Sequence, residues 1–227
     1  MKVICNIVSE FSKLHLNELN EWYNWPLNKN HLPKGITILE GNNYTKNISL
    51  KKQLHALWKD EKDETTKGDL IAYYIVKWGG IKTNRATSLN TYRTSSAEEL
   101  IIKGKQGVAS WSKALVVHDW NNYAIFDARV SCSLNILQIL AKKEIKVLFP
   151  ILSSRNNLII KGNLQVKEIS IKENWTKLSG VNFYTDYIKL LKSVADELNT
   201  NISTIEMLLF SKAEILVMQL INLNNKK

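Results

Sequence analysis

Gly107-Val-Ala-Ser-Trp-Ser-Lys-Ala-Leu115 and the stretch after it, Asn121-Asn-Tyr-Ala-Ile-Phe-Asp-Ala-Arg-Val130, decide how we expect the chain to fold. The first stretch leaves a glycine turn with helical spacing and carries Lys113 among apolar neighbours. In the second, a strand-like apolar run gives way to helical spacing at Asp127, which is where a helix N-cap belongs. The turn therefore brings a lysine and an aspartate together. Either they are the charged groups of a reaction, or they are a surface charge and a helix cap.

The segments before the turn carry helical signals. Helical spacing begins at Ser49, and we expect the charged run that closes at Gly68 to end this helix. A second helix is expected from Asp69, as its cap, to Trp78, where Gly79-Gly80 stops it.

A basic, hydroxyl-rich connection is expected from Ile81 to Ser95. Ser96 and Glu99 then form the pattern of a capping box, which opens a short helix ending near Lys103. Gly104-Lys-Gln-Gly107 is a tight turn, so that two short helices flank a glycine turn.

The two ends of the chain are less regular in pattern. Residues 1–48 are rich in turn formers, with a short helix expected at 22–26 and a strand at 36–39. Residues 144–180 contain β-branched, alternating stretches and are expected to form a loop-rich insertion or a small strand pair. An amphipathic helix is expected at 185–199, and Ser203 with Glu206 is expected to cap the last helix.

These patterns predict a mainly α-helical protein that forms a single compact unit over residues 1–227. Two lobes are possible within it: residues 49–143, which hold the turn and the helix after Asp127, and residues 1–48 plus 144–227 packed around them. The chain has 227 residues, 44% of them hydrophobic, which is enough to bury a core. No apolar run reaches the length of a signal peptide or a membrane span, so we expect a cytoplasmic protein without membrane contact, and a monomer.

The charge of the chain bears on its partners. The 31 Lys and Arg residues exceed the 21 Asp and Glu residues and give a net charge of +10, which favours nucleic acid or an acidic membrane surface. AT-rich coding would also raise the lysine content without any ligand, so charge alone leaves both explanations open. Cys5 and Cys132 lie far apart without a CxxC pattern or a nearby histidine, which indicates neither a metal site nor a disulfide.

Four short blocks, in this order, carry a resemblance to the helix-hairpin-helix DNA glycosylases, and specifically to bacterial proteins described as 8-oxoguanine DNA glycosylase-like. The blocks are Val76-Lys-Trp-Gly-Gly-Ile81, Gly107 to Leu115, Ala124-Ile-Phe-Asp-Ala-Arg-Val130 and Ile205-Glu-Met-Leu-Leu-Phe210, within residues 69–216. The resemblance implies a two-lobed helix-hairpin-helix glycosylase-like fold with a small loop or strand insertion. It also implies excision of a damaged or modified base from double-stranded DNA, with an 8-oxoguanine-like purine favoured.

The resemblance also implies roles for single residues. The acid after the hairpin is catalytic in this family and corresponds to Asp127. A lysine on the second hairpin helix is the nucleophile of members with lyase activity, and Lys113 is the match. The family's Leu-x-Gly-Val-Gly-x-Lys hairpin is absent here, because Gly104 and Gly107 are spaced differently and Lys113 lies about two turns past the second glycine. Lys105, inside the turn, is therefore the competing lysine.

Further residues complete the expected site. DNA contacts are expected from residues of the turn and of the basic connection, and from one arginine beside the acid: Gly104, Lys105, Gly107, Lys82, Arg85 and Arg129. Aromatic side chains would line a pocket for the flipped base: Trp78, Trp111 and Phe210. The chemistry requires neither a metal nor another cofactor, because a carboxylate stabilises the sugar cation and a neutral lysine amine can hold C1′ as a Schiff base.

Each of these residues also has a structural explanation. Asp127 can serve as an N-cap alone, Lys113 can be a surface lysine, and the glycines can close a turn. Trp78 and Phe210 can pack in a core. Two other functions therefore remain open: a non-catalytic helix-hairpin-helix module that holds duplex DNA, and an RNA-binding protein that stacks single-stranded bases on aromatic side chains.

Overall fold

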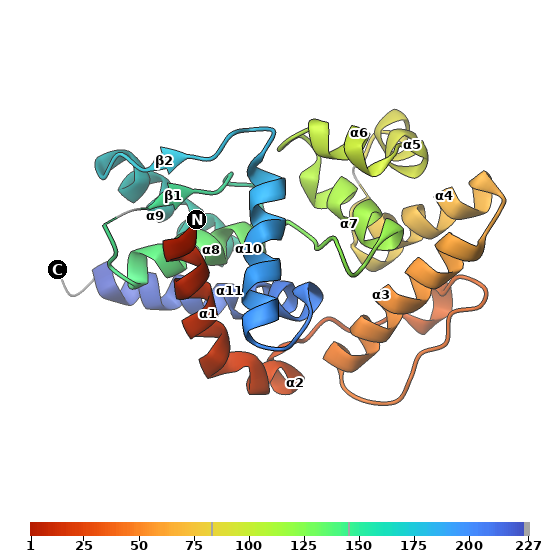
Figure 1. The fold of residues 1–227 in the computed structure, drawn as a ribbon, viewed down its shortest axis with the longest axis horizontal. Coiled ribbons are helices and arrows are strands. Elements are labelled where there is room, and N and C mark those ends of the chain that lie inside the picture. Colours follow the sequence, from red (N-terminus) through yellow and green to blue (C-terminus); the bar gives the residue numbers. More distant parts are fainter. Residues whose placement is uncertain (83, 145, 225–227) are drawn as a thin grey trace.

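Helices make up most of the computed structural model, which describes residues 1–82, 84–144 and 146–224 (Figure 1). This confirms the mainly α-helical class. The elements in chain order are α1 (Lys2–His15), η1 (Leu16–Glu18), α2 (Leu19–Trp22), η2 (Lys29–His31), α3 (Asn43–Asp60), α4 (Glu64–Ala72), η3 (Tyr73–Trp78), α5 (Ala86–Thr94), α6 (Ala97–Ile102), α7 (Val108–His118), α8 (Ala128–Leu140), β1 (Val147–Leu148), α9 (Asn157–Lys172), β2 (Thr176–Lys177), α10 (Phe183–Glu197) and α11 (Ile202–Asn224). The elements η1 and η2 are 3-10 helices, whereas η3 is a π-helix.

The helices form two groups that lie side by side in Figure 1. In one group α3, α4, η3, α5 and α6 pack around α7. In the other, α11 packs against α8, α9 and α10, and α1 covers α10 and α8. The main apolar core runs through both groups and includes Leu54, Trp111, Leu134 and Leu209. A smaller cluster is formed by Leu19, Tyr23, Met207 and Leu208. The chain crosses from one group to the other between α7 and α8, through residues 119–127.

Helix α8 lies in the second group, whereas the sequence had placed it in a lobe of residues 49–143. Almost every residue of α8 is buried, because it lies between α11, α9 and α1. The boundary between the groups therefore falls just before Asp127, and Lys113 and Asp127 come from opposite sides of it.

Three expectations for the first half of the chain are wrong. Helix α1 occupies residues expected to be irregular, and its buried Ile4, Ile7 and Val8 have the helical spacing that would have revealed it. No strand forms at 36–39. The connection at 81–95 contains α5, whose buried Tyr92 anchors it to the core.

Helix α4 begins earlier than expected, while the expected end at Trp78 agrees with the end of η3. Asp63 caps it by accepting from the Thr66 amide, so Asp69 lies inside the helix and is not the cap. Gly68 does not end a helix either: it is buried where the Arg93 side chain packs, and a Cβ there would lie 2.9 Å from Arg93 Nε. The helix runs directly into η3, whose C-cap is Gly79.

The second half also differs in places. Residues 144–180 contain α9, capped by Asn156, and β1 pairs with β2 in parallel over two residues each. The β-branched residues of α9 had suggested strands. Asn201, not Ser203, caps α11, because its side chain accepts from the Thr204 amide while Ser203 is buried.

The elements around the opening stretch follow the sequence closely. The capping box of Ser96 and Glu99 opens α6, Gly107 precedes α7, and Asp127 is the N-cap of α8. Among the described residues, no helix combines the length and the apolar character needed to cross a bilayer.

His118, the last residue of α7, makes the stability of the fold depend on pH. Its ring stacks on Trp58 of α3 at 4.5 Å, and burial lowers its pKa from the usual 6.5 to about 4. Between pH 6.5 and pH 4 the His118 ring is protonated in the unfolded chain and neutral in the folded chain. The free energy of unfolding therefore falls as the pH drops from 6.5 to 4. The full loss is about 3 kcal/mol. Urea unfolding at pH 7 and at pH 4 measures this loss. In His118→Phe, the decrease in unfolding free energy between the two pH values should be smaller than in the wild type by about this amount. Equal losses in both proteins would contradict the assignment.

Candidate functional site

Lys113 and Asp127 line one small, partly enclosed cavity where the two groups of helices meet. Its volume is about 40 Å³, roughly enough for one water molecule. The lining residues come from five separate segments: Tyr23, Trp25, Trp78, Gly79, Lys113, Ile125, Asp127, Glu206 and Phe210. Three residues expected at the site besides Asp127, namely Lys113, Trp78 and Phe210, are thus brought together with it.

Lys113 is a buried lysine, 5% exposed, on the wholly buried middle of α7. Its Nζ donates to the Ala109 carbonyl at 2.5 Å. Burial lowers the pKa of the Lys113 amine, while the carboxylates of Asp127 and Glu206 oppose that shift. The amine is therefore held near two acids in a place where its neutral form is favoured more than on a surface, which is what a nucleophilic lysine needs.

Gly79 makes room for the Lys113 side chain. A Cβ at Gly79 would lie 2.6 Å from Lys113 Cε and 2.8 Å from the Ile75 carbonyl oxygen. The π-helix sets this position, since the Gly79 amide donates to the Tyr74 carbonyl five residues back. Gly79 was expected only to stop a helix, and its contact with the lysine could not be read from the sequence.

We expect Gly79→Ala to push Lys113 out of its place. Two contacts below 3 Å, one of them to backbone, require a shift that costs about 1–3 kcal/mol. Urea unfolding measures this cost, and the matched control is Gly180→Ala, whose Cβ meets nothing within 4 Å. A Gly79→Ala protein as stable as the control would show that Lys113 does not depend on this glycine.

Asp127 is both the cap of α8 and a wall of the cavity. Its Oδ1 accepts from the amides of Arg129 at 2.9 Å and Val130 at 3.0 Å. The extended segment before it is fixed by α10, where Tyr184 and Tyr187 donate their hydroxyl protons to the carbonyls of Ala124 and Ile125, each at 2.8 Å.

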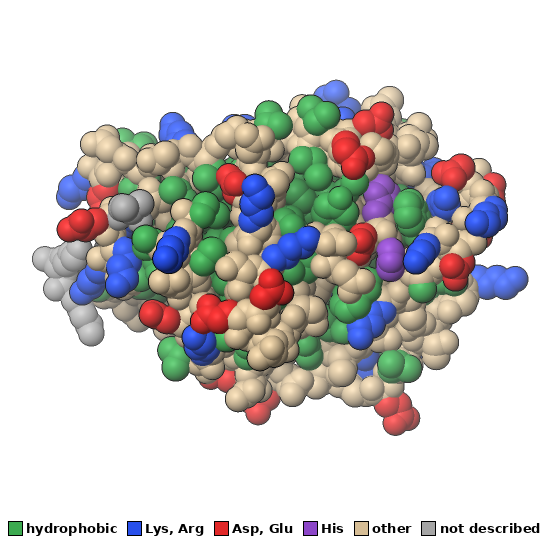
Figure 2. Space-filling model, in the orientation of Figure 1, with side chains coloured by type: hydrophobic (Ala, Val, Ile, Leu, Met, Phe, Trp, Pro, Cys, Tyr) green, Lys and Arg blue, Asp and Glu red, His purple; other side chains and the backbone are tan. Residues whose placement is uncertain are grey.

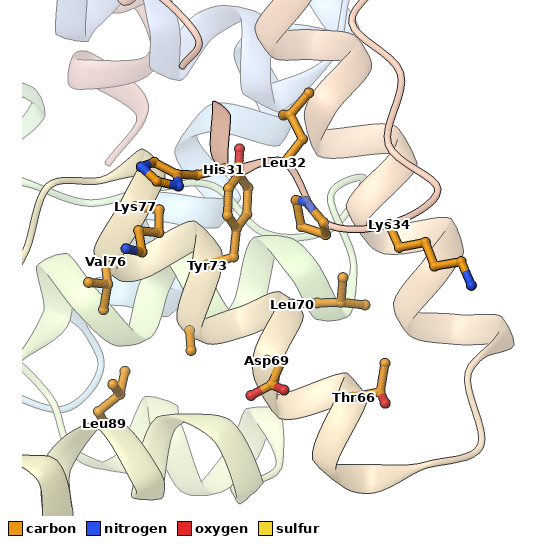
Figure 3. Close-up of a pocket in the computed structure, with 12 residues that line it drawn as sticks. His31, Leu32, Lys34, Thr66, Asp69, Leu70, Tyr73, Val76, Lys77 and Leu89 are labelled. Atoms are coloured by element: carbon orange, nitrogen blue, oxygen red, sulfur yellow. The ribbon is translucent and has the colours of Figure 1, made fainter. Parts of the chain in front are cut away.

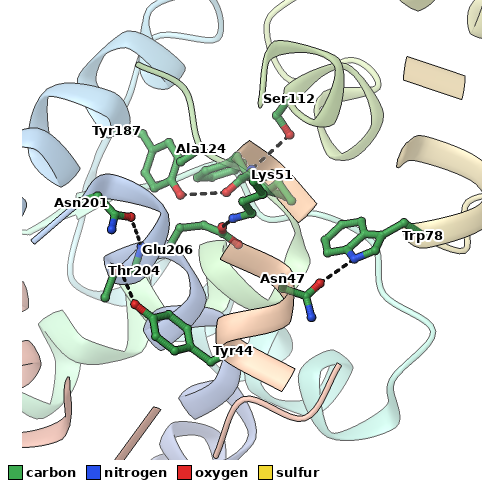
Figure 4. A network of polar contacts seen from close by, with 12 residues as sticks. Tyr44, Asn47, Lys51, Trp78, Ser112, Ala124, Tyr187, Asn201, Thr204 and Glu206 are labelled. Carbon is green, nitrogen blue, oxygen red and sulfur yellow. Dashed lines mark hydrogen bonds and ion pairs between the residues drawn. The ribbon is translucent and has the colours of Figure 1, made fainter. Parts of the chain in front are cut away.

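A second bond fixes the same segment to α7. The Phe126 amide donates to Ser112 Oγ at 3.1 Å, beside Lys113 on the helix (Figure 4). Asp127 therefore has a fixed position relative to Lys113, although the two residues belong to different groups of helices.

Aromatic rings close the cavity. Trp78 stacks on Tyr74 with ring centres 4.2 Å apart, and its Nε1 donates to Asn47 Oδ1 at 2.7 Å. Trp25 packs edge-on against Phe210 at 5.6 Å and donates its Nε1 proton to the Trp78 carbonyl at 3.2 Å. Trp25 and Tyr23 were not among the expected residues: the segment 22–26 was expected only to form a short helix, whereas α2 ends at Trp22 and both residues follow it.

Trp111 does not line the cavity, contrary to its expected place in a base pocket. It is fully buried in the core, where it packs against Tyr184 at 4.7 Å and donates to the Gln106 carbonyl. Trp111 precedes Lys113 by two residues, which places it about 200° around the helix, on nearly the opposite face, so sequence proximity misled.

A buried ion pair adjoins the cavity. Glu206 on α11 accepts from Lys51 Nζ on α3 at 2.5 Å, and both side chains are almost completely buried (Figure 4). Burial raises the pKa of Glu206, and the Lys51 ammonium opposes this. Glu206 was expected only to help cap the last helix. Its signal was a charged residue inside the apolar block Ile205 to Phe210.

The glycines of the α6–α7 turn are needed for both conformation and space. Gly104 has φ +58° and its Cβ would lie 2.1 Å from the Gly180 carbonyl oxygen. Gly107 has φ +71° and its Cβ would lie 2.1 Å from the Tyr92 hydroxyl. Lys105, between them, is exposed and lies outside the residues that line the Lys113 cavity.

The other expected DNA-contacting residues lie in different settings. Arg129 pairs with Glu214 at 2.6 Å and lies over the Phe210 ring, at the edge of the cavity. Lys82 and Arg85 are exposed in the segment that follows Gly80.

A larger cavity of about 620 Å³ lies on the first group of helices, between the segment at 31–34 and helices α4, η3 and α5 (Figure 3). Neither Lys113 nor Asp127 lines it. Tyr73 and Lys77 line both this cavity and a small one that Trp78 also lines. We place the chemistry in the smaller Lys113 cavity, because that is where the buried charged groups gather.

Comparisons of the chain with models of known families, with curated proteins and with solved structures found no match.

Proposed function

We propose that the chain is a DNA glycosylase of the helix-hairpin-helix kind, with Lys113 as the nucleophile and Asp127 as the stabilising carboxylate. The observation that carries the proposal is that both residues line one partly enclosed, aromatic-walled cavity. The resemblance of the four sequence blocks supports the same assignment, and each block contributes a residue to the cavity: Gly79, Lys113, Asp127 and Glu206.

The chemistry needs a neutral amine and a nearby negative charge. The lone pair of Lys113 Nζ forms a bond to C1′ while the glycosidic bond breaks and its electron pair leaves with the base. Asp127 stabilises the positive charge that develops on the sugar. Loss of a proton from the resulting ammonium and opening of the sugar ring give a Schiff base, from which β-elimination cuts the strand. Burial of Lys113 lowers its pKa in the direction that this step requires.

The cavity must open to admit a base, since about 40 Å³ holds little more than a water molecule. Trp25 is the side chain to move, because it comes from the segment between α2 and α3 rather than from a long helix. The small volume is also the one observation that favours the second candidate, a non-catalytic module that holds duplex DNA. Such a module needs no substrate space beside Lys113.

Borohydride trapping on duplex DNA tests the proposal. We expect the wild-type chain to form a covalent adduct with DNA that carries an abasic site or a damaged purine, with an 8-oxoguanine-like base as the favoured substrate. Lys113→Ala should abolish the adduct, whereas Lys105→Ala should retain it. An adduct that persists in Lys113→Ala and disappears in Lys105→Ala would transfer the role to the turn lysine. No adduct and no base release on any duplex, with DNA binding intact, would favour the non-catalytic module.

A further inference from the structure

A second, open groove adjoins the α6–α7 turn on its far side from the first group of helices. Its volume is about 590 Å³, and it lies between the turn, β1, β2 and α9. Three lysines from three separate segments line it: Lys105 of the turn, Lys167 of α9 and Lys177 of β2. Its apolar lining includes Leu148, Ile151 and Ile171.

The elements around the groove are fixed to one another. The turn and the segment after β2 touch so closely at Gly104 and Gly180 that no side chain would fit between them. The two short strands pair, and the Leu178 amide donates to the Leu148 carbonyl at 3.2 Å just past them. The three lysines are therefore held on a common framework.

The charge of the groove is of one sign. Within the part of the chain that the structure describes, none of the residues that line it is acidic. By contrast, the face of the molecule over α1 and α10 shows basic and acidic side chains interspersed (Figure 2). Three cations around an apolar floor complement a sugar–phosphate backbone, because phosphates take the ammonium groups and deoxyribose takes the apolar surface.

One segment links this groove to the Lys113 cavity. Pro150 and Ile151 line the groove, and the Pro150 carbonyl accepts from Ser131 Oγ at 2.6 Å, one turn after Asp127 on α8. Five residues after Pro150, Arg155 donates to the Gly80 carbonyl at 3.3 Å, next to Gly79 in the cavity wall. A strand of DNA could follow this segment from one site to the other.

We infer that the groove lined by Lys105, Lys167 and Lys177 binds the backbone of the DNA strand whose nucleotide enters the Lys113 cavity. The inference rests on the proposed function for the identity of that strand. It gives residues 144–180 a role in DNA binding, where the sequence had suggested only an insertion.

The test measures binding of the full chain to a labelled duplex that carries an abasic-site analogue, at salt concentrations from about 50 to 200 mM. In Lys167→Ala/Lys177→Ala, the slope of log affinity against log salt should fall by about 2, and affinity near 0.1 M salt should fall by more than about tenfold. Lys59→Ala/Lys189→Ala is the matched control, since it removes the same charge from exposed positions on α3 and α10. Lys167→Arg/Lys177→Arg should restore the slope.

The outcomes separate the two proposals. A groove variant whose slope equals that of the control overturns the groove, even if Lys113 still forms its adduct. Unchanged duplex binding together with lost binding of polyglutamate also overturns it, in favour of an acidic peptide. A groove-dependent slope in a protein that forms no adduct supports the groove as a DNA site and rejects the proposed catalysis.

Discussion

Asp127→Asn is expected to slow base release by roughly 10²–10³-fold while leaving the chain about as stable as the wild type. In the proposed mechanism the carboxylate provides the negative charge opposite the sugar cation, and an amide provides none. As a helix cap, however, asparagine is equivalent to aspartate, so α8 keeps the bonds to the amides of Arg129 and Val130. Activity and stability therefore separate at this one residue.

The measurement is single-turnover base release from a duplex that carries the favoured damaged purine, together with urea unfolding. Asp127→Ala is the matched variant: it removes the charge and the cap, and should lose about 1 kcal/mol of stability as well as the activity. If the Asp127→Asn protein releases base at the wild-type rate, the Asp127 carboxylate has no part in the mechanism. A loss of stability equal to that of Asp127→Ala would show that its loss of activity is structural.

The same substitution predicts a shift in pH dependence. The Asp127 carboxylate raises the pKa of Lys113 against the larger effect of burial. Removing the negative charge makes the ammonium form less favourable, so the pKa of Lys113 falls further. The pH midpoint of adduct formation in Asp127→Asn should therefore lie below that of the wild type. A midpoint that moves upward would contradict the proximity of the two groups.

The sequence predicted those parts of the fold that are fixed by neighbours along the chain. The capping box at Ser96, the glycine turn and the cap at Asp127 each depend on residues within four positions. Helix α9 was missed because its β-branched residues have strand propensity, which packing against α11 and α8 overrides.

The site was predictable only in part, for a similar reason. Lys113 and Asp127 lie 14 residues apart in the sequence, and the short connection between their helices indicated that they would lie close together. Trp25, Lys51 and Glu206 come from distant segments, and only tertiary packing brings them to the cavity. Gly79 shows the limit most clearly: its glycine is required by the side chain of a residue 34 positions away.

Breaking the buried pair of Lys51 and Glu206 is expected to have the largest effect on stability. Glu206→Leu leaves the Lys51 ammonium buried without its partner, and Lys51→Met leaves a buried carboxylate. Each single change should cost about 3–5 kcal/mol of unfolding free energy. Removing both charges in Lys51→Met/Glu206→Leu should restore most of that loss or exceed it, because two desolvation penalties disappear with the pair.

Urea unfolding of the four proteins forms a double-mutant cycle, and a coupling energy of several kcal/mol is the expected result. If the two losses of unfolding free energy add, so that the double variant is the least stable protein, then Lys51 and Glu206 do not form the buried ion pair seen in the structure. The double variant also isolates the role of the pair at the site. Lys51 lowers the pKa of Lys113 and Glu206 raises it, so the two effects leave together. If the double variant is stable and still forms the Lys113 adduct, the pair belongs to the framework of the cavity. If the double variant folds but forms no adduct, Glu206 belongs to the groups that the reaction requires.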